Sequence, residues 1–74
     1  MLFWLTFKTK RQTEVFIAEA GFLGMARLKA GMASQQGEFQ EGHQLDSQTT
    51  KKIPKQMIGR TLSREEAERL LKLL

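Results

Sequence analysis

The chain has 74 residues, a length at which one small domain buries a core barely large enough for stability. It contains no cysteine, which excludes disulfides and cysteine-ligated zinc and fits a reducing, cytoplasmic compartment. The formal net charge of +4 favours an acidic partner such as nucleic acid, although solubility alone explains so modest an excess equally well.

Two strands joined by a basic loop are predicted at the N-terminus. Residues 2–7 and 13–18 are rich in aromatic and β-branched side chains, and the stretch 8–12 between them is short enough for a hairpin. The basic residues of this loop follow the first apolar run, whereas those of a signal peptide precede it. No stretch approaches the length of a membrane span, so we expect no membrane contact.

Both faces of the first predicted strand are apolar, although a sheet in a small monomer usually keeps one polar face. Either helices cover both faces, or the strand meets a partner chain, for which a second copy is the simplest choice. The second alternative predicts a homodimer whose interface contains Leu2, Trp4 and Phe16.

Residues 22–33 predict a helix, despite interior glycines that each cost about 1 kcal/mol relative to alanine. Met25 and Met32 suggest either an adaptable binding groove or core filling, and core filling is the expectation. Arg27 and Lys29 are expected to face solvent.

Residues 34–52 are polar and predict either a long mobile loop or one short strand near 38–45. Glu41, His43 and Asp46 lie close together in this stretch, and such groups can bind a divalent metal or supply a catalytic base. Their spacing matches no specific site pattern, so we expect no metal site, no cofactor and no catalytic residue here.

The last part of the chain predicts an extended segment followed by a helix. Pro54 excludes a regular helix around it, and Ile53 is expected to hold the segment against the core. Ser63 and Glu66 have the spacing of a capping box at the start of a helix that runs to the C-terminus. The apolar stripe of this helix is Ala67, Leu70, Leu71 and Leu74.

These elements predict a small α+β fold in residues 1–74. An antiparallel N-terminal hairpin, with a third short strand as an alternative, is packed by two helices.

The basic residues fall into two groups, one in the hairpin loop and one before the last helix. If the fold brings the groups together, they form a positive ridge able to contact phosphates. The predicted phosphate-binding residues are Lys8, Lys10, Arg11, Lys51, Lys52, Lys55 and Arg60. Trp4, Phe7 and Phe16 border the loop and can stack on unpaired bases, but the core needs large side chains and is their expected place.

Residues 53–71, from Ile-Pro-Lys through Gly-Arg-Thr-Leu-Ser to Glu-Arg-Leu-Leu, resemble a segment in the C-terminal accessory repeats of bacterial type IA topoisomerases. In that family, too, a Gly-Arg-x-Leu-Ser step leads into a helix of Glu, Ala and Leu. The resemblance covers under a third of the chain. It implies a DNA-associated role, and no residue's function is carried over from it.

Two functions follow from the sequence. The first is a small basic accessory or regulatory protein that binds DNA or RNA phosphates through its basic loops. The alternative is a non-enzymatic protein-interaction module, a homodimer through the first strand. Neither an enzyme nor a small-molecule substrate is expected, because no Gly-rich phosphate loop or nucleophile with a base is present.

Overall fold

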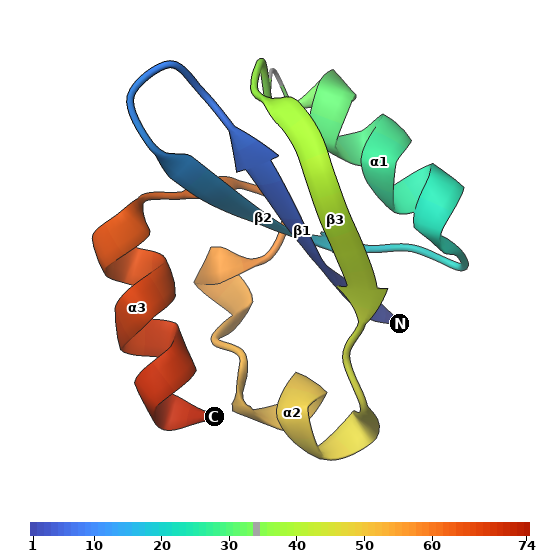
Figure 1. The fold of residues 1–74 in the computed structure, drawn as a ribbon. Helices are drawn as coiled ribbons and strands as arrows, with labels where there is room; N and C mark the ends of the chain where they lie inside the picture. Colours follow the sequence, from blue (N-terminus) through green and yellow to red (C-terminus); the bar gives the residue numbers. More distant parts are fainter. Residues whose placement is uncertain (34) are drawn as a thin grey trace.

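A four-stranded antiparallel sheet forms the middle of the fold, with its strands in the order β3-β1-β2-β4 (Figure 1). The structure is a computed structural model and describes residues 1–33 and 35–74. β1 (Leu2–Lys8) and β2 (Thr13–Glu19) pair along their whole length. β3 (Glu38–Gln44) pairs with the other edge of β1, and β4 (Thr61–Leu62) pairs with β2. The predicted α+β class and its N-terminal hairpin are confirmed.

Thr9 closes the hairpin turn without the help of a glycine. Its N–H donates to the carbonyl oxygen of Gln12 at 2.9 Å. Its hydroxyl accepts from the N–H groups of Arg11 and Gln12 at 3.3 and 3.2 Å. Threonine hydroxyls often organise turns in this way. Lys10 and Arg11 therefore stand at the tip of the hairpin.

Helices cover both faces of the sheet (Figure 1). α1 (Leu23–Met32) packs on one face, and α3 (Arg64–Leu73) packs on the other. The alternation of side chains along β1 divides the core between them. The cluster under α1 contains Phe3, Leu5, Phe7, Phe16 and Ala18. The cluster under α3 contains Leu2, Trp4, Val15, Ile17, Leu62 and Leu70.

The predicted interface residues Leu2, Trp4 and Phe16 lie inside these two clusters. Trp4 is only 8% exposed, and the other two are more deeply buried. The helices of the chain itself therefore account for the two apolar faces of β1, which was the first of the two alternatives. A dimer through these three side chains would require the core to open, so their apolar character gives no reason to expect a partner there.

The polar stretch predicted as a loop contains two regular elements. β3 forms at the position of the alternative strand, and α2 (Ser47–Lys52) follows it. The Asp46 carboxylate caps α2 by accepting the N–H of Thr49 at 2.7 Å, and buried Leu45 anchors the approach. The sequence prediction missed α2 because all its residues are polar. Residue 34, where the predicted loop begins, lies outside the described residues.

The segment before α3 packs against the core as predicted. Ile53 is buried, and the short 3-10 helix η1 (Lys55–Met57) follows Pro54. The carbonyl of Ile17 accepts the N–H of Gly59 at 2.7 Å, and Gly59 takes a positive φ of 82°. This conformation favours glycine and turns the chain into β4.

The capping box of α3 is confirmed. The Ser63 hydroxyl accepts the N–H of Glu66 at 3.2 Å, and the Glu66 carboxylate accepts the N–H of Ser63 at 3.2 Å. The same carboxylate binds the Arg60 guanidinium at 2.6 Å. The predicted apolar stripe is half right, because Ala67 and Leu70 are buried whereas Leu71 and Leu74 are exposed.

Candidate interaction surface

α1 turns its small residues toward the sheet and its large apolar residues toward solvent. Ala26 and Ala30 are fully buried against the sheet. Leu28 is 63% exposed and Met32 is 78% exposed. The exposed large side chains on and just before this helix are Phe22, Leu23, Met25, Leu28 and Met32. The predicted core role of Met25 and Met32 is therefore wrong.

Close packing between α1 and the sheet explains this arrangement. An added Cβ on Gly42 of β3 would lie 2.6 Å from Leu5 Cδ2 and 2.9 Å from Leu23 Cδ1. Real Cβ atoms do not approach that closely, so the start of α1 sits tightly on β1 and β3. Ala26 and Ala30 are the right size for a gap this narrow, whereas a leucine there would lift the helix from the sheet.

The two charged side chains of α1 turn toward the sheet instead of standing outward. The guanidinium carbon of Arg27 lies 4.1 Å from the ring centre of Phe39 on β3. Lys29 Nζ donates to the carbonyl oxygen of Glu19 at 2.6 Å. The predicted solvent-facing positions of both residues are thus only partly right, since the residues are exposed but their charged ends have partners within the chain.

The outer face of α1 is consequently uncharged, and we define it by Gly24, Met25, Leu28, Gly31 and Met32. Helical spacing places these residues on the side away from Ala26 and Ala30. Solvent-exposed helices usually carry their charged residues on the outer face, whereas Arg27 and Lys29 of α1 lie at the flanks of this face. Figure 1 shows that no other element of the described chain lies over this side of α1.

Grooves flank α1 on both sides. The groove beside β3 has a volume of about 470 Å³ and is lined by Gly24, Arg27, Leu28 and Gly31 of α1 together with Phe7, Gln35, Gly37 and Phe39. The rings of Phe7 and Phe39 meet edge to face at a centroid distance of 5.6 Å, and the Arg27 guanidinium lies over the Phe39 ring. The groove on the other side has a volume of about 370 Å³ and includes Lys29, Met32 and Ile58.

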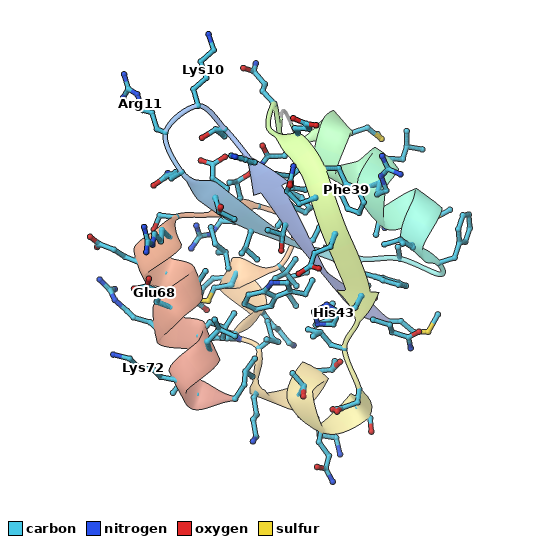
Figure 2. All side chains as sticks on the ribbon, in the orientation of Figure 1. Lys10, Arg11, Phe39, His43, Glu68 and Lys72 are labelled. Atoms are coloured by element: carbon cyan, nitrogen blue, oxygen red, sulfur yellow. The ribbon has the colours of Figure 1, made fainter. Side chains whose placement is uncertain are left out.

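The structure does not bring the two predicted basic groups together. Lys10 and Arg11 project from the hairpin tip (Figure 2), with Lys8 at the end of β1. Lys51 and Lys52 lie in α2, at the opposite end of the fold from the hairpin tip (Figure 1).

Two further basic residues complete this picture. Lys55 lies in η1, close to α2 in sequence. Arg60 is bound to the Glu66 carboxylate, whose hydrogen bond raises the pKa of Arg60. The single positive ridge expected from the sequence is therefore not formed. In its place are a hairpin group (Lys8, Lys10, Arg11) and an α2 group (Lys51, Lys52, Lys55).

Trp4, Phe7 and Phe16 belong to the core, as the sequence favoured. All three are buried under the helices, so they present no ring on which an unpaired base could stack.

The group of His43, Glu41 and Asp46 is divided between two elements. Glu41 and His43 lie on the edge strand β3 and are exposed. Asp46 caps α2, and the Thr49 N–H lowers the pKa of its carboxyl. Within residues 1–33 and 35–74, no three carboxylate, imidazole or thiol groups lie close enough together to hold a metal ion.

No helix in the described part of the chain is long and apolar enough to cross a lipid bilayer. Comparison with known proteins finds no matching family model, no matching curated protein and no matching solved structure.

The sequence analysis missed the outer face of α1. The signal was present in the spacing of Ala26 and Ala30, which form a small-residue stripe at i and i+4. With this stripe on the sheet, the large side chains of Leu28 and Met32 can only point outward. The feature to notice was an outer face on which neither Arg27 nor Lys29 lies.

Proposed function

We propose that this chain is a non-enzymatic protein-interaction module that docks another polypeptide on the outer face of α1. The observation that carries the proposal is the uncharged outer face, with Leu28 and Met32 more than half exposed beside a groove that Phe7, Phe39 and Arg27 line. Soluble monomers rarely leave contiguous apolar surface uncovered, and larger patches mark interaction sites.

The energetics favour covering this face. Full burial of one leucine or methionine side chain contributes about 1.5–3 kcal/mol. Leu28 and Met32 lie one helical turn apart, so a single partner element can bury both at once. Methionine adapts its shape to a partner more readily than branched side chains do, which suits a docking surface.

The chemistry of the remaining surface supports a binding role in preference to catalysis. His43 is the only histidine, and it is exposed on an edge strand away from any buried carboxylate. General acid–base catalysis needs a base held in place beside the reacting group. The proposal includes a cytoplasmic location, which the absence of cysteine supports.

Photo-cross-linking in the producing cells tests this function. The photoreactive amino acid p-benzoylphenylalanine is placed at Leu28 or, as the matched control, at Leu71 of α3. These two leucines are 63% and 57% exposed, so both substitutions leave the core intact. We expect discrete larger products from position 28 and few from position 71. Equal products from both positions, or none from position 28, would contradict the proposal.

The hairpin group supports a second function, the binding of nucleic-acid phosphates. Lys10 and Arg11 extend into solvent at the tip (Figure 2), and neither makes an ion pair with another described residue. Fluorescence anisotropy with labelled DNA and RNA tests this function at low and physiological salt. Binding that is lost in Lys10→Gln/Arg11→Gln but kept in Lys51→Gln/Lys52→Gln supports the hairpin site. The affinity of the hairpin variant should also depend less steeply on salt concentration, because the variant makes fewer phosphate contacts. No binding at low salt excludes it.

A further inference from the structure

We infer that the hairpin group binds double-stranded nucleic acid, through the phosphates of the duplex, in preference to a single strand. This inference rests on the second proposed function and names the class of nucleic acid. Three features of the hairpin carry it: a fixed turn, a short positive surface and buried aromatic rings.

The hairpin turn holds its cations in place before any ligand arrives. The N–H and the hydroxyl of Thr9 both donate to the carbonyl oxygen of Gln12, each at 2.9 Å. Lys10 and Arg11 stand between these two residues and extend into solvent (Figure 2). A pre-organised turn loses little conformational freedom on binding, so it suits a ligand that is itself stiff, as a duplex is.

The positive surface of the hairpin is short and is bounded by acidic side chains. From Lys8 to Thr13 the chain contains three cations and no acidic residue. Glu38 lies opposite Lys8 in the sheet, and Glu14 follows Thr13. Single strands bind along a continuous positive groove that follows their backbone. Such a path would meet Glu14 or Glu38 within a few residues here, whereas a stiff duplex can touch the tip alone.

No aromatic ring in residues 1–33 and 35–74 is free beside the tip to stack on an unpaired base. Phe7 and Phe16, on the two strands of the hairpin, are buried. The guanidinium of Arg27 lies over the Phe39 ring at 4.1 Å. Exposed Phe22 follows β2 at the end opposite the turn. Single-strand binding draws much of its affinity from stacking, whereas the phosphates of a duplex need only cations.

The number of cations in the hairpin group sets the expected salt dependence. Three phosphate contacts give a slope of about −2.7 for the logarithm of the duplex affinity against the logarithm of the salt concentration. Between about 20 and about 150 mM salt, this slope lowers the affinity about two hundredfold. Removal of two of the three cations should leave a slope of about −0.9.

Fluorescence anisotropy of the purified chain with four labelled probes tests the inference at both salt concentrations. The probes are a DNA duplex, one of its strands alone, and the RNA duplex and RNA strand of the same sequence. At low salt a duplex should bind at least about tenfold more tightly than its strand, and the DNA and RNA arms show which duplex is preferred.

Two double variants with the same change in charge locate the contact. Lys10→Gln/Arg11→Gln should lose the duplex preference and most of the salt slope. Lys51→Gln/Lys52→Gln, which removes two cations from α2, should keep both. The fluorescence of buried Trp4 checks that each variant is folded.

Each contrary outcome has a distinct meaning. A strand bound as tightly as its duplex overturns the inference but leaves phosphate binding by the hairpin standing. No binding of any probe at low salt overturns both the inference and the second function. A duplex preference that the two double variants lose equally shows that net charge attracts the duplex, and it overturns the hairpin as the site.

Discussion

Replacing Leu70 with alanine should destabilise the chain far more than the same change at Leu28. Leu70 on α3 is fully buried, whereas Leu28 on α1 is 63% exposed. Replacing a buried leucine with alanine costs about 2–5 kcal/mol of stability, because apolar burial is lost and a cavity is left in the core. Changes at exposed positions usually stay within about 0.5 kcal/mol.

The core change is large relative to the stability of so small a protein. A chain of 74 residues is expected to have a free energy of unfolding of about 4–11 kcal/mol. With a urea m-value of about 1 kcal/mol/M, a loss of about 3 kcal/mol lowers the unfolding midpoint by about 3 M. Leu70→Ala therefore removes a large part of the stability, and Leu28→Ala shifts the midpoint by about 0.5 M or less.

Urea unfolding followed through Trp4, the only tryptophan, measures both changes. Leu71→Ala serves as the exposed control on α3. If Leu28→Ala costs as much as Leu70→Ala, the orientation of α1 described above is wrong.

Three further changes test particular contacts. Gly42→Ala should cost about 1–3 kcal/mol by crowding the buried Leu5 and the neighbouring Leu23, and thermal unfolding measures the change. An unchanged melting temperature would contradict the close approach of α1 to β3. Ser63→Ala should cost about 1 kcal/mol by removing the cap of α3, seen as a lower urea midpoint, whereas Ser63→Asp should retain most of the stability. Hydrogen bonds from the Arg60 guanidinium and the Ser63 N–H lower the pKa of Glu66 from 4.5 to about 2. The ionised carboxylate therefore stabilises the fold above pH 4.5, and this contribution is lost as the pH falls toward 2. Between pH 4.5 and pH 2, the urea midpoint of Glu66→Gln should fall less than that of the natural chain. An equal fall in the two proteins would show that the Arg60–Glu66 ion pair contributes nothing to stability.

Elements with strong local signals could be predicted from the sequence. The hairpin follows from two β-rich runs around residues 8–12, and α3 follows from the capping box of Ser63 and Glu66. These signals lie within a few residues of one another, so no knowledge of the tertiary fold is needed to read them.

Elements that depend on distant partners were harder to predict. α2 has no apolar side, and its stability comes from the Asp46 cap and from the anchoring of its ends by Leu45 and Ile53. β4 is two residues long and exists because Leu62 pairs with Val15. Strands this short carry no periodicity of their own.

The orientation of α1 was mispredicted for a physical reason. Burial normally favours large apolar residues, so Met25 and Met32 were assigned to the core. The α1 residues buried against the sheet are Ala26 and Ala30, and the space between helix and sheet is a property of the assembled fold. The separation of the hairpin group from the α2 group is likewise a tertiary property, which no spacing in the sequence reveals.

Photo-cross-linking in the producing cells tests the central claim, the docking of a polypeptide on the outer face of α1, most directly. The account predicts discrete larger products from p-benzoylphenylalanine at position 28 and few from position 71 of α3, where the natural leucines are 63% and 57% exposed. No products from position 28, or equal products from both positions, would contradict it.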